Sequence, residues 1–268
     1  MGRVLDWLEA RAPRQETGRL VYGMGVALAV PLAWAWLAGA AERFVPWPLH
    51  ALALKPAFAG RALLDAGRRV ESALDGHQLA GAREELCSLV SRPTASLDAP
   101  LVAAAAIESL AENTVDSWLA PLLAYSLFGL SGAYAYRAIN TADAMWGYRN
   151  ERYERLGKAA ARVDDVVNFI PARLGALVLC CVAGARWKNA LETWRRDGGL
   201  TASPNAGQTM ACAAGALGVR LEKPDHYVLN ASAPPPGTAS MAQGRELVAR
   251  GMWLAAALAV LIRVVTRG

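Results

Sequence analysis

Three acidic residues are spaced so that a single helix face would carry all of them. Glu108, Glu112 and Asp116 stand four residues apart at the start of "AAIESLAENTVDSWLAPLLAYSLFGLSG", which covers residues 105–132. Residues four apart in an α-helix lie on one face. Like charges there repel, more strongly beside an apolar run, so a cation, protons or basic groups must offset them. The alternative is a solvated acidic face at the end of a membrane span.

A second polar stretch, residues 137–168, repeats this chemistry. Asn140 and Asp143 are three apart, and Asp164, Asp165 and Asn168 fall within about one helical turn. Oxygen ligands of this kind suit magnesium, which takes one or two carboxylates and completes its shell with water and phosphate oxygens. We therefore predict a magnesium site with ligands drawn from Glu108, Glu112, Asp116, Asp143, Asp164 and Asp165. The predicted catalytic residues are Glu112, Asp116, Asp143 and Asp165.

The same stretch is rich in arginine, at Arg149, Arg152, Arg155 and Arg162. The planar guanidinium fits phosphate and carboxylate oxygens, so arginines beside carboxylates indicate a magnesium-nucleotide or phosphorylated-substrate site. Surface ion pairing is the alternative for each of them, and we favour it for Arg155. The chain contains neither G-x-x-x-x-G-K-[ST] nor G-x-G-x-x-G, so ATP would bind without these loops.

Apolar segments must position these residues. Residues 20–41 carry no charge and, as a helix, would extend about 33 Å, enough to cross the hydrocarbon core of a bilayer. A signal peptide is the competing interpretation, but its h-region would be shorter and more apolar segments follow. Residues 117–136 also lack charge. The hydrophobic content of 54% and the mean hydropathy of +0.20 favour a membrane protein.

We predict an all-α, multi-pass membrane protein that forms a single catalytic domain over residues 1–268, with about four to five hydrophobic helices and cytoplasmic amphipathic helices. Its predicted parts are a transmembrane helix at 20–41, an amphipathic helical hairpin at 58–91, a motif-bearing core at 105–227 and a C-terminal span at 247–265. Residues 45–60 predict either a second, kinked span or an interfacial segment.

Composition also disfavours several classes of function. The net charge of +5 is modest and the basic residues are scattered among acidic ones, so we expect no nucleic-acid partner. The four cysteines show no C-x-x-C spacing and lie far from the three histidines, which indicates neither a disulfide framework nor a zinc site.

Three segments carry a resemblance to a known family: "AAIESLAENTVDSWLAPL", "AINTADAMWGYRNERYERLGKAAARVDDVVNFIPARL" and "SPNAGQTMACAAGALGVRL". Together they resemble the cobalamin biosynthesis CobD/CbiB family, the adenosylcobinamide-phosphate synthases, over roughly residues 58–227. The resemblance implies a membrane enzyme, a carbon-nitrogen ligase that uses ATP and Mg²⁺. It would join adenosylcobyric acid, a corrinoid, to aminopropanol or its phosphate. It further implies a multi-pass location in the inner membrane with the active site facing the cytoplasm, and partners that include the lipid bilayer and other late cobalamin-assembly membrane enzymes.

Site residues follow from the resemblance by position. The substrate- and phosphate-binding set comprises residues that match the family's motifs, Asn113, Asn140, Arg149, Asn168, Arg173, Ser203, Asn205 and Gly207, together with Arg152 and Arg162 from the arginine-rich stretch. Backbone amides of the 203–207 loop would cradle an anion. A turn that caps the following helix is the alternative for Ser203.

The chain departs from the family pattern at Pro93, Ala104 and Thr209, where we expect aspartate, arginine and proline. The family's N-terminal hydrophobic helix with its D-x-x-x-G-D-P segment is also missing from the sequence. A full membrane span at 117–136 would place the first and second acidic motifs on opposite sides of the membrane, although both should face the cytoplasm. We therefore predict a re-entrant hairpin at 117–139 that turns at residues 129–132.

Two other functions stay open at this level. A magnesium-dependent prenyl or phosphoryl transferase would also line helix ends with aspartates, but its paired D-x-x-x-D motifs are not present. A membrane transporter or sensor would place its charges inside the apolar runs, whereas most of them lie just outside.

Overall fold

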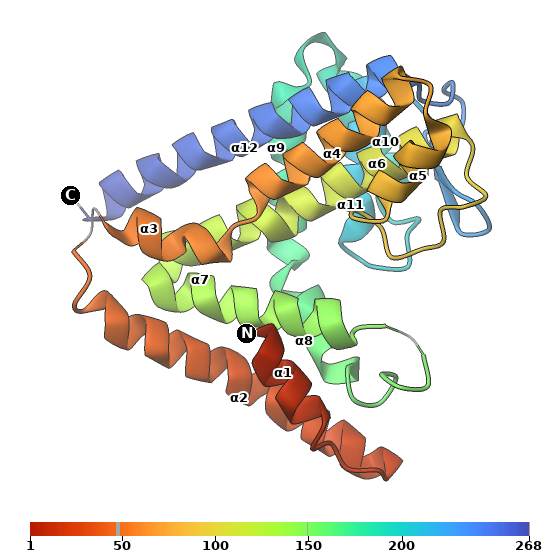
Figure 1. The fold of residues 1–268 in the computed structure, drawn as a ribbon. Coiled ribbons are helices and arrows are strands. Elements are labelled where there is room, and N and C mark those ends of the chain that lie inside the picture. The colour runs from red at the N-terminus through yellow and green to blue at the C-terminus, as the bar shows by residue number, and fades with distance from the viewer. Residues whose placement is uncertain (47–48, 149, 268) are drawn as a thin grey trace. The chain divides into compact units, whose positions relative to one another are not determined.

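The chain is mostly helical, as expected, and a computed structural model describes residues 1–46, 49–148 and 150–267 (Figure 1). It divides into two compact units, each assembled from two segments. Unit 1 comprises Met1–Phe58 and Ala120–Asn168, and unit 2 comprises Ala59–Leu119 and Phe169–Gly268. The first acidic motif therefore belongs to unit 2 and the second to unit 1.

Unit 1 is built on a long helix, α2, with a second long helix, α7, packed along it (Figure 1). Its elements are α1 (Gly2–Glu9), α2 (Glu16–Glu42), α3 (His50–Leu54), the 3₁₀ turn η2 (Lys55–Ala57), α7 (Ala120–Trp146) and α8 (Lys158–Val167). The buried core joins side chains of α2 and α7 with Leu5 and Leu156: Val26, Ala27, Val30, Ala138, Ala142 and Trp146.

Helix α7 reverses direction at Gly129, inside the turn that the sequence predicts. Gly129 has φ 68° and ψ −153°, a conformation that only glycine adopts without strain. A Cβ built on Gly132 would lie 3.0 Å from the carbonyl carbon of Ala124, eight residues earlier. A straight helix would separate these residues by about 12 Å. The two halves of α7 therefore form a helical hairpin.

The carboxylate of Glu42, at the end of α2, fixes this turn. Its Oε2 accepts the backbone N–H of Leu130 at 3.0 Å, and a Cβ on Gly129 would approach Oε1 to 2.6 Å. The buried His50 lies 3.8 Å from the same carboxylate and 3.1 Å from the hydroxyl of Tyr125. A negative charge at the N-terminal end of the returning half of α7 is also favoured by the helix dipole. The turn thus lies level with the C-terminal end of α2.

Helix α2 is the one helix among the described residues that is long and apolar enough to cross a membrane. A second candidate exists if α8 and α9, which Asn168 separates, count together as one span. The prediction of four to five spans stays a prediction.

Unit 2 places one helix, α6, at the centre of a layered helical bundle. Its elements are α4 (Gly60–Asp75), α5 (Leu79–Leu86), α6 (Ala99–Thr114), the π-helical turn η3 (Val115–Leu119), α9 (Phe169–Val182), the 3₁₀ turn η4 (Gly184–Arg186), α10 (Trp187–Asp197), α11 (Ala206–Leu217), β1 (Leu221–Lys223), β2 (Tyr227–Leu229) and α12 (Thr238–Arg267). Helices α4 and α5 lie within the segment for which the sequence predicts a helical hairpin.

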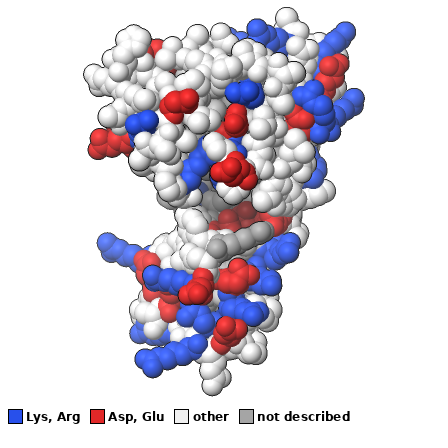
Figure 2. Space-filling model, turned by 90° about the vertical axis from the view of Figure 1, so that its right-hand side faces the viewer, with Lys and Arg blue, Asp and Glu red and all other residues white. Residues whose placement is uncertain are grey.

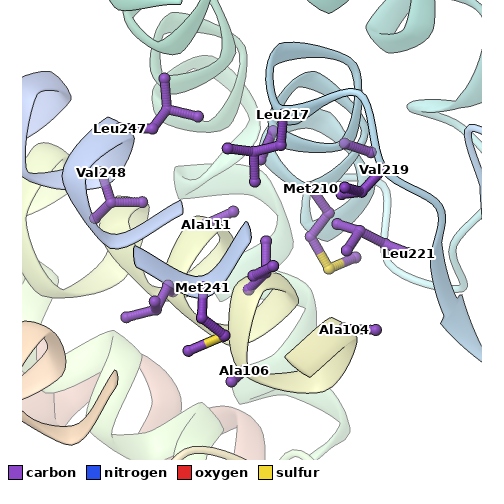
Figure 3. Close-up of a cluster of buried hydrophobic side chains, with 14 of the residues drawn as sticks. Ala104, Ala106, Ala111, Met210, Leu217, Val219, Leu221, Met241, Leu247 and Val248 are labelled. Carbon is purple, nitrogen blue, oxygen red and sulfur yellow. The ribbon is translucent and has the colours of Figure 1, made fainter. Parts of the chain in front are cut away.

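Small side chains let the neighbours of α6 approach closely. Every residue from Val102 to Ala111 is buried, and four of these in a row are alanines. Figure 3 shows Ala104, Ala106 and Ala111 among side chains from α11, α12 and β1: Met210, Leu217, Leu221, Met241, Leu247 and Val248. The position that carries Ala104 in place of the expected arginine is fully enclosed by this core. All four cysteines are thiols, and those at 180 and 212 are in contact, with Sγ atoms 3.3 Å apart.

A short antiparallel sheet is a feature that the sequence did not predict. Strands β1 and β2 pair Leu221 with Leu229 and Lys223 with Tyr227, and β1 packs on α6. Because strand side chains alternate between faces, Leu221 and Lys223 share the face on which Leu221 is buried, whereas Glu222 points the other way. The hairpin therefore presents a lysine and a tyrosine on its inner face.

Candidate functional site

The first acidic motif holds a buried ion pair. Glu108, in the middle of α6, is only 4% exposed, and its Oε2 accepts a hydrogen bond from an Nη2–H of Arg92 at 3.1 Å. Arg92 comes from the connection between α5 and α6, which the hydroxyl of Ser109 anchors by donating to the carbonyl of Leu89 at 2.7 Å. Burial raises the pKa of Glu108 to about 7, although the Arg92 guanidinium acts in the opposite direction.

The sheet adds two more polar groups to this pair. Lys223 and Tyr227 lie close enough to Glu108 to lower its pKa, and in return burial and Glu108 raise the pKa of the Tyr227 phenol. Arg92, Glu108, Lys223 and Tyr227 together form what we call the α6 cluster, with Glu112 as its fifth member. These five residues come from α6, from the connection before it and from the sheet.

Glu112 is the accessible member of the α6 cluster. Its side chain is exposed, and desolvation by the surrounding protein raises its pKa to about 7. The charges of Asp116 and Glu108 act in the same direction, and those of Lys223 and Arg92 oppose them. A carboxyl whose pKa is raised towards neutrality can exchange a proton at that pH.

Asp116 lies one turn beyond, in the π-helical turn η3. The turn is held by two bonds: the backbone carbonyl of Ser117 accepts the N–H of Ala59 at 3.0 Å, and the indole N–H of Trp118 donates to the carbonyl of Met252 at 2.9 Å. Single π-turns are frequent at functional sites because they re-aim one side chain. Asn113 donates to the carbonyl and hydroxyl of Ser109, so its amide braces α6.

Backbone N–H groups of the loop at 203–207 donate hydrogen bonds to hydroxyl groups of the same loop and of the residues just before it. The Ser203 hydroxyl accepts the N–H groups of Asn205 and Ala206, and the Thr201 hydroxyl accepts that of Gly207 at 3.0 Å. These bonds favour the helix-capping alternative over an anion cradle. The loop does meet another predicted residue, because an Nη1–H of Arg173 donates to Oδ1 of Asn205 at 3.4 Å.

In unit 1, hydrogen bonds connect some residues of the second acidic motif. The Tyr136 hydroxyl donates to Oδ1 of Asn168 at 2.9 Å, and the Asn168 amide donates to Oδ2 of Asp164 at 2.9 Å. This chain fixes the end of α8 on α7. Asn140 accepts from Arg137 at 3.3 Å, and the backbone carbonyl of Asp143 accepts the N–H of Gly147 at the end of α7.

The predicted phosphate-binding arginines differ in their surroundings. Arg152 pairs with Glu9 at 2.6 Å, and Arg155 pairs with Glu16 at 3.3 Å between exposed side chains. Surface pairing is thus the better interpretation for both. Arg162 is exposed on α8, Asp165 is half-buried there, and Arg149 lies outside the described residues. Figure 2 shows Lys and Arg side chains interspersed with Asp and Glu on the face in view.

Magnesium does not fit the α6 carboxylates as a set. Among the residues that the structure describes, no group of three or more His, Cys, Asp or Glu side chains is placed to hold a metal ion. Glu108 is already committed to Arg92. Magnesium needs no more than one or two protein carboxylates, so a magnesium site at the unit 1 aspartates, Asp143, Asp164 and Asp165, stays a prediction.

Residues 1–255 match the sequence model of the family described as CobD/Cbib protein. The chain belongs to this family. It is 39% identical over 272 residues to a cobalamin biosynthesis protein CobD of Rhodobacter capsulatus, with 94% of this chain and 86% of the relative covered. A protein of the same name from Dehalococcoides mccartyi is 42% identical over 85% of this chain and 78% of its own length. Another from Mycobacterium tuberculosis is 44% identical over 71% and 64%. No solved structure matches the chain.

For this member of the CobD/Cbib family, sequence reasoning missed Arg92, Lys223 and Tyr227. Arg92 precedes Pro93, in a short connection with no helical period, and the other two residues follow the last quoted motif. The available signal was the surplus of carboxylates on α6, since a carboxylate buried in a protein core requires a basic partner from elsewhere in the chain.

Proposed function

We propose that this chain acts in cobalamin biosynthesis and catalyses an ATP-dependent amide synthesis that joins adenosylcobyric acid to aminopropanol or its phosphate. Its membership of the CobD/Cbib family and the names of its relatives support the pathway. The observation that carries the reaction is the α6 cluster: an accessible glutamate, Glu112, lies one helical turn from a buried arginine-glutamate pair, and its surroundings raise its pKa towards neutrality. Such a group suits the handling of an amine at neutral pH.

The chemistry sets the tasks for the chain's own residues. ATP supplies the phosphoryl group that turns the corrinoid carboxylate into an acyl phosphate. The amine nitrogen then attacks the acyl carbon, the C–N bond forms, and the C–O bond to phosphate breaks. From its ammonium form the nitrogen loses two protons, one to a carboxylate base before the attack and one to the departing phosphate after it, and the amide keeps one N–H. Glu112 is the proposed base, and the unit 2 residues around it exclude water and hold the amine in reach.

We assign the nucleotide end of the reaction to residues of unit 1. One or two of the aspartates Asp143, Asp164 and Asp165 are the proposed protein ligands of magnesium, and Arg162 is the exposed arginine proposed to contact phosphate. In unit 2, Arg173 on α9 is a further candidate to bind a carboxylate or phosphate group of a substrate, because a hydrogen bond to Asn205 positions its guanidinium.

We also propose that the protein lies in the cytoplasmic membrane. Leu28, Leu32 and Trp36 follow one face of α2 and are 60%, 68% and 71% exposed. An apolar stripe of this size on a helix that packs through its other face fits contact with lipid. If α2 crosses the bilayer, the turn at Gly129 lies at the face where α2 ends, because Glu42 binds Leu130 there. The turn of the α7 hairpin would then lie at that surface of the bilayer and not at mid-depth.

Product formation is the test of this function. The purified protein in detergent is incubated with ATP, Mg²⁺, adenosylcobyric acid and either aminopropanol or its phosphate. We expect a product whose mass equals the sum of both substrates minus water, and none when ATP is omitted. Asp165→Asn is expected to lower the rate at least tenfold, with Asp225→Asn, in the exposed turn of the sheet, as a matched control. Product in equal yield without ATP would refute the ATP-dependent reaction.

A further inference from the structure

Two buried thiols meet where α9 packs against α11. Cys180 on α9 and Cys212 on α11 stand 32 residues apart in the chain, yet their Sγ atoms lie 3.3 Å from each other. Cys180 is 7% exposed, and Cys212 is fully enclosed by the core of unit 2. Neither thiol takes part in the proposed reaction. A pair of nucleophilic side chains in contact therefore stands without a role.

Hydrogen bonds orient the two sulfur atoms toward each other. The S–H of Cys212 donates to the backbone carbonyl of Ala176, one turn before Cys180 on α9, with Sγ and oxygen 3.2 Å apart. Because this bond engages the proton of Cys212, Cys180 is the donor in the contact between the two thiols. The Cys212 sulfur thus presents its lone pairs to Cys180, and it can attack that sulfur once Cys180 is oxidised.

The crossing of α9 and α11 is tight enough for a covalent bond. Glycine at position 175 lets the helices approach, since a Cβ built there would lie 3.0 Å from Cγ2 of Thr209 on α11. An S–S bond measures about 2 Å, so the two sulfurs need to move little more than 1 Å closer, which side-chain rotation can supply. The other two thiols, Cys87 and Cys181, are exposed and have no cysteine within such reach.

We propose that Cys180 and Cys212 are a redox-active dithiol, which a peroxide oxidises to an intrachain disulfide and a thiol reductant restores. Cys180 loses its proton, and its sulfur attacks one peroxide oxygen while the O–O bond breaks. With hydrogen peroxide, this step leaves a sulfenic acid and one water. The Cys212 sulfur then attacks the Cys180 sulfur, the S–S bond forms, the S–O bond breaks, and a second water leaves with the Cys212 proton. The dithiol loses two electrons, and the peroxide gains them.

The disulfide ties α9 to α11 inside unit 2. These helices are also linked by the hydrogen bond between Arg173 on α9 and Asn205, which precedes α11. A cross-link between residues far apart in sequence restricts the unfolded chain, so the oxidised form should melt several degrees higher than the reduced form. Where a cell keeps its thiols reduced, such a bond forms transiently and reports oxidation.

Peptide mapping tests the assignment. The full chain in detergent is treated with hydrogen peroxide, its remaining thiols are alkylated in denaturant, and the digest is analysed by mass. We expect a linked pair of peptides that contain Cys180 and Cys212, two hydrogen atoms lighter than their sum and separated again by dithiothreitol. A Cys87→Ser, Cys181→Ser double variant, which lacks both exposed thiols, should form the same link to the same extent.

A second variant identifies the attacking sulfur. In Cys212→Ser the oxidised Cys180 has no resolving thiol, so dimedone, which traps sulfenic acids, should label Cys180 about fivefold more than in the wild type. Cys212→Ala takes its place if the serine variant does not fold. The assignment is overturned if Cys180 and Cys212 remain thiols at a peroxide dose that oxidises Cys87, or if Cys212 links to Cys181 instead. A linked chain that melts no higher than the reduced chain would also contradict it.

Discussion

Replacing Glu112 by glutamine (Glu112→Gln) is expected to lower kcat/KM for amide formation about a hundredfold or more, and at the same time to stabilise the protein at pH 8. Glutamine keeps the shape of the side chain but cannot accept a proton from the amine. Loss of a positioned acid-base group typically costs a factor of about 10² to 10⁴. A residue with a purely structural role would lose stability together with activity.

The gain in stability follows from the pKa of Glu112. Burial and the charges of Asp116 and Glu108 raise this pKa to about 7, from an ordinary value of 4.5. The folded state therefore binds the proton more tightly than the unfolded state, and stability falls as the pH rises from about 4.5 through 7. Glutamine removes this loss. The variant should accordingly melt at a higher temperature than the wild type at pH 8, with the difference vanishing near pH 4.5.

Melting curves at several pH values and initial rates on the same preparations provide the measurement. In the wild type, kcat/KM should rise with pH through about 7, because only the ionised form of Glu112 can accept a proton from the amine. A variant that is inactive and also less stable at pH 8 would contradict this role for Glu112.

Replacing Arg92 by methionine (Arg92→Met) should destabilise the protein by about 3 kcal/mol at pH 8. Removing one partner of a buried ion pair leaves an uncompensated charge, which typically costs about 3 to 5 kcal/mol. The lower end applies because Arg92 keeps some contact with solvent. At pH 6 the loss should be smaller, because the raised pKa of Glu108 lets the isolated carboxyl take up a proton.

A double variant separates charge from packing. Arg92→Met combined with Glu108→Gln leaves no buried charge at this place, so most of the stability lost in Arg92→Met should return. Thermal or urea unfolding at pH 6 and pH 8 measures both variants. Equal destabilisation of the single and the double variant would show that Arg92 acts through its alkyl chain and not through Glu108.

Much of the fold could be predicted from local sequence patterns. The uncharged run at 20–41 lies inside α2, and glycine at 129 marks the reversal of α7 because its backbone conformation excludes other residues. The helix expected after the 203–207 loop is α11, which begins at Ala206. These features depend on a few neighbouring residues, and local chemistry is enough to fix them.

The site could be predicted only in part. Glu108 and Glu112 share a face of α6 because they are four residues apart, and spacing shows this directly. Their partners come from far along the chain: the sheet that carries Lys223 and Tyr227 has strands of three residues, too short for any periodic signal. For the arginines at 152 and 155, the ion pairs with Glu9 and Glu16 are likewise tertiary contacts that composition does not reveal.

The central claim, amide synthesis through an acyl phosphate, is tested most directly by following the carboxylate oxygen. Adenosylcobyric acid labelled with ¹⁸O in its free carboxylate is incubated with the protein, ATP, Mg²⁺ and aminopropanol, and the released phosphate is analysed by mass. We predict one ¹⁸O atom in inorganic phosphate for each amide formed. Label in AMP, or amide formation with unlabelled phosphate, would contradict the account.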